Sequence, residues 1–153
     1  MTFELTSSAL KTNGVIAKEY TCDGSDLSVP LSWKDAPERT KSFALIIDDP
    51  DAPRGTWVHW VIYDMPANTR ELSAGVGHED TLENGAKQGK NDFGKIGYGG
   101  PCPPSGPAHH YHFKLYALDQ TTGLKSRATK QQLLDAMKGH VLAEAKLIGT
   151  YKR

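Results

Sequence analysis

The stretch that most constrains this chain runs from Phe43 to Asp64, where two apolar runs meet at a corner rich in proline and aspartate. Phe43 to Ile47 is a continuous apolar run of strand length, which is typical of a central strand covered on both faces. The corner DDPDAP follows at residues 48–53. Proline lacks an N–H group and restricts the residue before it, so a strand ladder cannot continue there. The sequence therefore predicts two buried strands joined by a turn that carries acids.

The second of these strands places a histidine beside the acidic corner. Trp57 to Tyr63 regains strand character, and a period of two puts Trp57, His59, Val61 and Tyr63 on one face. We therefore expect the His59 imidazole to lie among aromatic and aliphatic neighbours. Such a histidine is often only a satisfied core residue, and a purely structural role remains an alternative.

Glycine and proline content indicates the fold class. The 15 glycines and 9 prolines are spread along the chain, which favours short strands joined by turns. The 153 residues are enough for one domain, so we predict a single, mainly β domain over residues 1–153. Strand-like pieces occupy residues 3–6, 15–18 and 31–33. Residues 67–92 show no sustained period, which predicts a long surface loop.

Charge and hydropathy exclude several classes of protein. Lysine and arginine balance aspartate and glutamate at 18 each, so net charge does not favour nucleic acid or anionic membrane as a partner. No apolar run approaches the ~18 residues that a membrane span needs. The first residues show no basic and apolar leader, so we expect a cytoplasmic protein.

The two cysteines do not indicate a metal or redox site. Cys22 and Cys102 lack CxxC spacing, so we expect reduced thiols. If the protein were exported, a single bridge between them would be the alternative, because both lie in turn-type loops.

A second unusual stretch, Phe93 to Pro107, contains five glycines and four prolines. Glycines let a ligand approach main-chain N–H groups, and prolines stiffen the loop. The strand His109 to Leu118 follows. Its alternation predicts that His109 and Tyr111 face inward at the mouth of an apolar face, and that His110 and His112 face outward with Lys114.

The C-terminal part predicts one or two short helices. Thr129 and Gln132 have the spacing of a capping box before an amphipathic helix. A second short helix is expected over His140 to Ala145, and Lys146 to Tyr151 is expected to be a final strand.

The polar groups expected to face inward form a candidate anion site. Imidazoles, a phenol O–H and loop N–H groups can together bind a small phosphate or carboxylate, and an aspartate can fix a histidine tautomer. We expect no cofactor and no catalytic residue. The side chains concerned are Asp49 or Asp51, His59, His109 and Tyr111.

Hydrolysis is the main enzymatic alternative. Asp49, Asp51 and His59, with one or more of His109, His110 and His112, could bind zinc or iron. Against this, the outward histidines share a face with a lysine, and no HExxH motif occurs. A Ser-His-Asp hydrolase is weaker still, because no GxSxG elbow is present.

Several blocks in order resemble the phosphatidylethanolamine-binding protein family, and within it the short bacterial and archaeal Raf kinase inhibitor-like branch. The blocks are YTCDG, DPDAP, W-x-HW, GYGGPCPP-x-G and H-x-Y-x-F-x-LYAL. The resemblance implies an antiparallel β-sandwich of Greek-key type with a small anion pocket at one end. It also implies binding of phosphorylated head groups and, for some members, inhibition of a protein kinase or a serine protease. We expect a monomer or a homodimer.

Matched residue by residue, the resemblance gives the pocket a specific composition. It puts Asp49 at the rim and Trp57 and His59 in the wall. The family usually has arginine where this chain has His110, so any ion pair made there becomes dependent on pH. The expected ligand-binding residues are Asp49, His59, His109, Tyr111, Gly100, Pro101 and Pro103, and the expected supporting residues are Asp51, Pro53, Trp57, Cys102 and Pro104.

Overall fold

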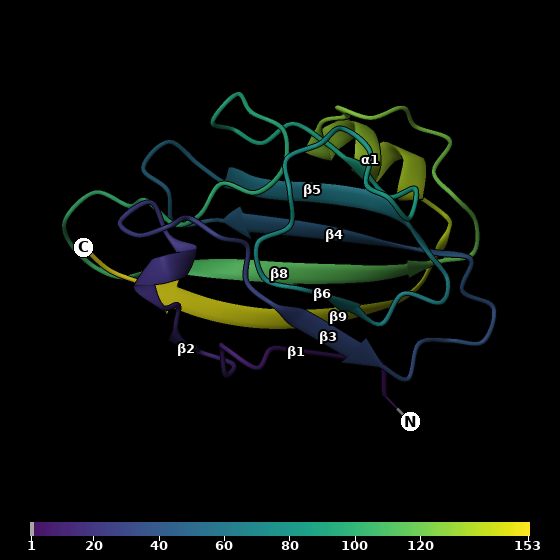
Figure 1. The fold of residues 1–153 in the computed structure, drawn as a ribbon, viewed down its shortest axis with the longest axis horizontal. Helices are drawn as coiled ribbons and strands as arrows, with labels where there is room; N and C mark the ends of the chain where they lie inside the picture. Colours follow the sequence, from purple (N-terminus) through teal and green to yellow (C-terminus); the bar gives the residue numbers. More distant parts are fainter. Residues whose placement is uncertain (1) are drawn as a thin grey trace.

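Two β-sheets enclose the core of the protein, as the computed structural model of residues 2–153 shows (Figure 1). The larger sheet has the order β2-β9-β8-β4-β5-β7 and the smaller one β1-β3-β6. Neighbouring strands are antiparallel except β2 and β9. The predicted mainly β class is confirmed. The elements are β1 (Glu4–Thr6), β2 (Gly14–Val15), η1 (Lys18–Tyr20), β3 (Leu31–Lys34), β4 (Ser42–Asp49), β5 (Trp57–Pro66), β6 (Glu71–Leu72), β7 (Lys87–Gln88), β8 (His109–Leu118), α1 (Lys130–Met137) and β9 (Val141–Tyr151).

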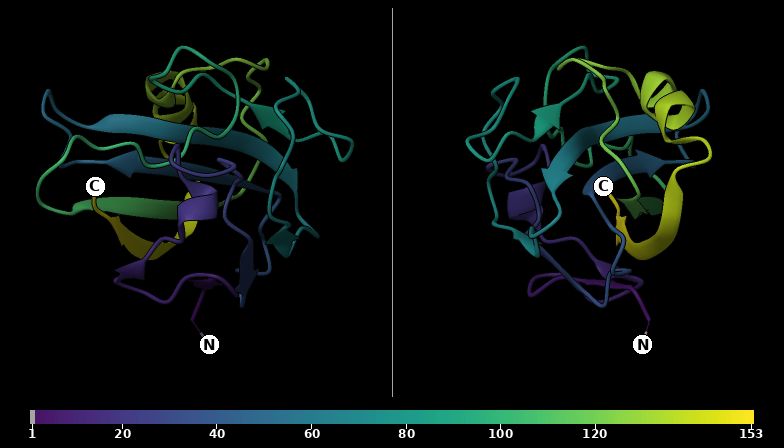
Figure 2. Two further views of the ribbon diagram at one scale, coloured as in Figure 1. Left: turned by 60° about the vertical axis from the view of Figure 1, so that its left-hand side comes forward. Right: turned by 90° about the vertical axis from the view of Figure 1, so that its right-hand side faces the viewer.

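Strand β4 lies in the middle of the larger sheet and is buried along its whole length. Side chains such as Phe43 and Leu45 pack into the core between the two sheets. Ala44 and Ile46 point to the other face, where they pack under α1 with Leu133. The helix and the smaller sheet thus cover opposite faces of the larger sheet (Figure 2). The prediction of a central strand covered on both faces is confirmed.

A β-bulge interrupts the pairing of β4 with β5 at His59. Ile47 pairs with Trp60 and Asp48 pairs with Val58, so His59 has no partner of its own in β4. An extra residue on one strand changes which face the following side chains occupy. Trp60 therefore points into the core between the sheets, next to His59 in sequence.

Because of the bulge, the side chains of β5 do not all lie on the predicted face. Trp57 and His59 do lie together, lining one cavity. Val61 and Tyr63, however, pack on the opposite side of the sheet, under the helix. The prediction that these four side chains share one face is wrong because a strict period of two does not survive an inserted residue.

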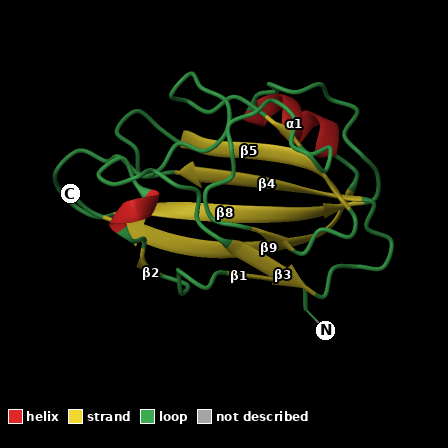
Figure 3. Ribbon diagram, viewed as in Figure 1, coloured by secondary structure: helices red, strands yellow, loops and turns green. Residues whose placement is uncertain are grey.

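One α-helix is present in residues 2–153, and it begins with the predicted capping box. Thr129 Oγ1 accepts a hydrogen bond from Gln132 N at 3.1 Å, and Thr129 N donates to Gln132 Oε1 at 2.9 Å. Neither α1 nor η1 is long and apolar enough to cross a membrane (Figure 3).

The predicted second helix over His140 to Ala145 is wrong, because strand β9 begins at Val141. It pairs with β8 along the whole length of that strand. Ala145, Leu147 and Gly149 are buried and their neighbours are more exposed, which is the period of a strand and not of a helix.

Residues 67–92 are also more ordered than predicted, since they contain β6 and β7. The buried side chain of Gln88 holds this segment in place. Its Oε1 accepts from Trp60 Nε1 at 2.8 Å, and its Nε2 donates to the carbonyls of Gly77 and Glu79 at 2.7 and 2.9 Å. One polar side chain in a segment without periodicity therefore determines its path.

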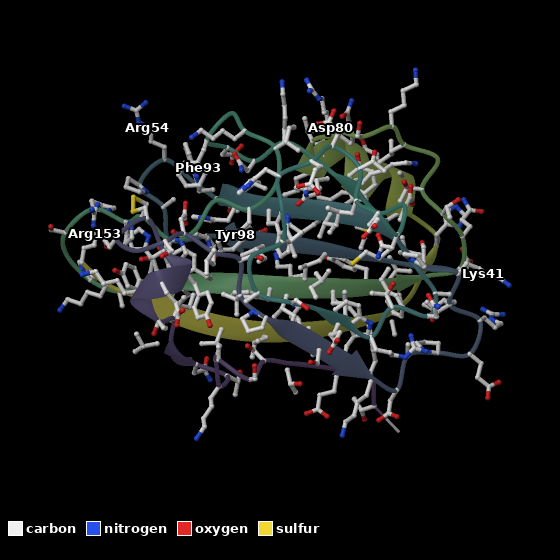
Figure 4. All side chains as sticks on the ribbon, viewed as in Figure 1. Lys41, Arg54, Asp80, Phe93, Tyr98 and Arg153 are labelled. Atoms are coloured by element: carbon white, nitrogen blue, oxygen red, sulfur yellow. A yellow bond between two sulfur atoms is a disulfide. The ribbon has the colours of Figure 1, made fainter. Side chains whose placement is uncertain are left out.

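Cys22 and Cys102 form a disulfide, so the expectation of reduced thiols is wrong (Figure 4). Hydrogen bonds from two backbone N–H groups hold their loops side by side. Cys22 N donates to the carbonyl of Pro101 at 3.1 Å, and Gly100 N donates to Asp26 Oδ1 at 2.9 Å. The Cα atoms are consequently 5.4 Å apart, within the usual range for a bridge.

Candidate functional site

A cavity of about 210 Å³ opens at the end of the larger sheet where β4 ends and β5 and β8 begin. These strands are antiparallel neighbours, so the end of one lies beside the starts of the other two. The acidic corner after β4 and the loop before β8 complete the wall. The cavity is lined by Asp49, Ala52, Pro53, Trp57, His59, Phe93, Cys102, Pro103, Pro104, His109 and Tyr111.

Asp49 and His109 form a buried pair in this cavity. The carboxylate Oδ2 accepts from His109 Nδ1 at 2.7 Å, and Oδ1 accepts from the Asp51 N–H at 2.8 Å. Both oxygens of Asp49 are therefore engaged within the protein. The contact holds the proton of His109 at Nδ1 and leaves Nε2, which has no partner among residues 2–153, available to a ligand.

His59 has a different environment. Its Nδ1 donates to the carbonyl of Gly99 at 2.7 Å. Burial lowers the pKa of His59, although the carbonyl of Gly99 and the charge of Asp49 act in the opposite direction. A neutral ring with its proton on Nδ1 has a lone pair at Nε2. The neutral form of His59, which burial favours, therefore offers an acceptor to the cavity.

Tyr111 contributes a neutral hydroxyl. Burial, together with the negative charges of Asp49 and Asp51, raises the pKa of Tyr111 well above its usual value. The side chain is almost fully buried, and its hydroxyl makes no hydrogen bond to another residue of the described chain. It is therefore available as a donor to a ligand in the cavity.

Aromatic rings form one wall, and Phe93 is the aromatic lining residue that sequence reasoning missed, as it also missed Ala52 of the acidic corner. Its ring lies edge to face with those of Trp57 and His59, with centroids 5.4 Å apart in both cases. The ring packs over Gly99, where an added Cβ would come within 2.5 Å of Phe93 Cδ2. A lone phenylalanine in a glycine-rich loop gives no periodic signal.

The proline-rich loop is only partly in the cavity. Pro103 and Pro104 line it, as does Cys102, whereas Gly100 and Pro101 do not. The N–H of Gly100 is used by Asp26. A side chain at Gly100 would also meet the carbonyl of Tyr20 at 2.3 Å. This glycine thus permits two loops to pack closely. Its N–H was expected to face the cavity, but it donates to Asp26 instead.

Asp51 lies outside the cavity and pairs with His110. Its Oδ2 accepts from the backbone N–H of His110 at 2.8 Å and from Nδ1 at 2.7 Å. These hydrogen bonds lower the pKa of Asp51. The pair ties the acidic corner to the first residues of β8.

Within residues 2–153, no group of three or more histidine, cysteine, aspartate or glutamate side chains is arranged to hold a metal ion. His59 and His109 both direct Nδ1 to protein acceptors. The residues proposed for a metal site in the alternative hypothesis are thus divided between the cavity, which holds Asp49, His59 and His109, and the outer surface, which holds Asp51 and His110.

Comparisons with known proteins identify similar chains over nearly the whole length. The model of the phosphatidylethanolamine-binding protein family matches residues 6–152. The UPF0098 protein of Methanothermobacter thermautotrophicus is 51% identical over 97% of this chain and 98% of its own length. The UPF0098 protein of Aquifex aeolicus is 50% identical over 98% of this chain and 88% of its own length.

Two solved structures are similar in fold. A proposed phosphatidylethanolamine-binding protein homologue from Chlamydia trachomatis superposes with a TM-score of 0.91 at 41% identity, covering 99% of this chain and 98% of that one. E. coli YbcL superposes with a TM-score of 0.92 at 35% identity, covering 100% and 99%.

Proposed function

Because this chain belongs to the phosphatidylethanolamine-binding protein family, we propose that the cavity of about 210 Å³ binds a small phosphate- or carboxylate-bearing head group without transforming it. The observation that carries the proposal is the set of unpartnered polar atoms on Tyr111, His109 and His59 in one small, largely aromatic cavity. The volume suits one head group and not a large substrate.

The polar atoms favour a singly protonated phosphate. The Tyr111 hydroxyl donates, and the imidazole of His109, whose Nδ1 donates to Asp49, also donates through Nε2 when it is in its charged form. The neutral His59 accepts through Nε2, which suits a P–OH group. An anion with one hydroxyl therefore uses all three groups, whereas a carboxylate uses only the two donors.

The test is a calorimetric titration with inorganic phosphate, phenyl phosphate and acetate at pH 6. We expect Tyr111→Phe to weaken phosphate binding about threefold to tenfold, because it removes one hydrogen bond and leaves the ring. His112→Ala, outside the cavity on the other face of β8, is the matched control. Affinity that is unchanged by Tyr111→Phe would contradict the proposal.

The rim of the cavity favours a ligand presented by another protein as a second candidate. Trp57 and Phe93 are large apolar side chains that line the cavity, are 36% and 39% exposed and pack edge to face. Exposed aromatic side chains beside a small polar cavity are typical of recognition surfaces. We propose that the protein acts as a regulator of a kinase or serine protease by docking one acidic or phosphorylated group.

Turnover and inhibition assays distinguish binding from catalysis. Phosphomonoesters, carboxylic esters and peptides are incubated with the protein, with and without divalent metal, and a serine protease and a protein kinase are then assayed in its presence. Dose-dependent inhibition that His109→Ala weakens is expected. Hydrolysis that depends on His59 or His109 would establish a lipid-handling or metal-dependent hydrolase instead.

A further inference from the structure

A second hollow, of about 570 Å³, adjoins the cavity already described. Phe93 and Cys102 line both, so they form the wall between them. In Figure 4 Phe93 and Tyr98 lie toward the same end of the molecule as the disulfide. The second hollow is lined by Cys22, Ser25, Asp26, His78, Asn91, Phe93, Lys95, Tyr98, Gly99, Gly100 and Cys102.

The second hollow offers polar atoms that the protein itself does not use. Asp26 accepts from Gly100 N through Oδ1, which leaves Oδ2 without a partner within residues 2–153. His78 uses Nε2 toward the carbonyl of Tyr98 at 3.1 Å, which leaves Nδ1 as an acceptor. The ammonium group of Lys95 forms no ion pair with any described residue. Acceptors and one charged donor therefore alternate around this hollow.

Asn91, in contrast, is fully engaged and fixes the wall. It is 4% exposed, and its Nδ2 donates to Gly97 O at 2.9 Å. Its Oδ1 accepts from the N–H groups of Phe93 and Lys95 at 3.0 and 3.1 Å. The backbone of the wall is thus rigid, and the Phe93 ring remains 39% exposed. The exposed part of this ring is therefore a surface that a ligand occupying both hollows would contact.

We infer that the second hollow is a subsite for a polyhydroxylated part of the ligand whose anionic group lies in the first cavity, which makes the ligand a sugar phosphate or a glycerol phosphate. This inference rests on the proposed anion-binding function. A hydroxyl group both donates and accepts, so several hydroxyls match Asp26, His78 and Lys95 without adding charge. The C–H face of the same unit packs on the exposed ring of Phe93.

The alternatives fit this hollow less well. An alkyl chain would desolvate the Asp26 carboxylate and the Lys95 ammonium without replacing their hydrogen bonds to water. A second anionic group would be favoured by Lys95 but repelled by Asp26. An uncharged polar unit satisfies both groups through hydrogen bonds.

The experiment compares inorganic phosphate with glucose 6-phosphate by calorimetry on the whole protein. Two added hydrogen bonds predict that glucose 6-phosphate binds about tenfold tighter than inorganic phosphate. Lys95→Ala and His78→Ala should each reduce this gain to about threefold and leave the affinity for inorganic phosphate within about twofold. Lys90→Ala, an exposed lysine of the same loop that lines neither hollow, is the control for overall charge.

The outcomes separate the two proposals. If inorganic phosphate binds and glucose 6-phosphate binds no tighter, the subsite is overturned and the anion site stands. A gain that survives in both Lys95→Ala and His78→Ala also overturns the subsite, because it places the sugar elsewhere. If neither compound binds, the proposed function fails, and the subsite fails with it. Thermal unfolding of each variant verifies that it is folded.

Discussion

Two neighbouring aspartates at the end of β4 are both almost fully buried, yet they meet opposite environments. Asp48, 1% exposed, lies on the helix side of the sheet, and its Oδ2 contacts Lys114 Nζ at 3.2 Å and Lys130 Nζ at 2.7 Å. Asp49, 3% exposed, lies on the cavity side and contacts His109 at 2.7 Å. Two adjacent residues of one type therefore serve two faces of the sheet.

The difference between them lies in what their partners can do. The ammonium groups of two lysines meet one oxygen of Asp48, and this ionic cluster joins β8 to α1. The partner of Asp49 is an imidazole, a group that can bind a ligand through its second nitrogen, and His109 lines the cavity. Burial of an acid is thus not a sign of function by itself. The chemistry of the partner distinguishes Asp48, which lies in an ionic cluster, from Asp49, which lines the candidate site.

The largest expected effect is on stability, from Asp48→Asn. Removing this charge leaves two partly buried lysines, whose side chains are 25% exposed, without their counter-charge. We expect the free energy of unfolding to fall by about 3 kcal/mol. Urea unfolding measures it. Asp49→Asn is the matched control, and an equal or larger loss there would show that the two acids do not differ as argued.

The next largest expected effect on stability comes from the disulfide, whose Cys102 lines the cavity. The double variant Cys22→Ala/Cys102→Ala should lose about 2–3 kcal/mol of stability, because the bridge closes a loop of 80 residues in the unfolded chain. The hydrogen bonds of Cys22 N and Gly100 N keep the loops together in the folded state. Unfolding in urea with and without a reductant measures the effect, and a wild-type midpoint insensitive to the reductant would contradict it.

Much of the fold follows from local patterns. The alternation of β8 correctly places His109 and Tyr111 inward, and the prolines after β4 correctly mark a corner. Spacing alone identified the capping box of α1. In each case a short-range rule, either a side-chain period or a backbone restriction, determines the structure. These rules suffice to bring the acids and histidines of the site to one end of the sheet.

The rest depends on contacts that have no local signal. The bulge at His59 inserts one residue without changing composition, and it reverses the faces of Val61 and Tyr63. Phe93 enters the cavity only because its loop folds back over Gly99. The disulfide joins residues far apart in sequence. Each of these is set by how distant segments pack.

Asp49→Asn tests the difference between the two acids by its effect on ligand affinity. Asparagine can still accept a hydrogen bond from His109, but it has no charge to stabilise the imidazolium. We expect the affinity for inorganic phosphate at pH 7 to fall about tenfold, as the loss of one charge-assisted donor predicts. Asp48→Asn should leave affinity unchanged in the folded protein. Tighter binding by Asp49→Asn would instead mean that its carboxylate chiefly repels the anion.

The smallest expected effect concerns His59, the cavity histidine that is not paired with an acid. Burial lowers the pKa of His59 below the ~6.5 of an unfolded chain. Between the pKa of His59 in the folded protein and that in the unfolded chain, the unfolded chain binds more protons. The stability that His59 contributes is therefore fully present above about pH 6.5 and is lost as pH falls. His59→Asn keeps a donor for the carbonyl of Gly99 and cannot titrate in this range.

We therefore predict that the stability of wild type and of His59→Asn depends differently on pH. Urea unfolding of wild type and His59→Asn between pH 5 and 7 should show stability decreasing more steeply with acid in the wild type. Asp51, whose pKa is lowered by its hydrogen bonds to His110, gives its own loss only in more acidic solution. His112→Asn is the matched control, since His112 lies outside the cavity. Equal slopes for wild type and His59→Asn would show that folding does not lower the pKa of His59. Burial would then not favour the neutral ring, and the argument that His59 is the acceptor for a P–OH group would fail.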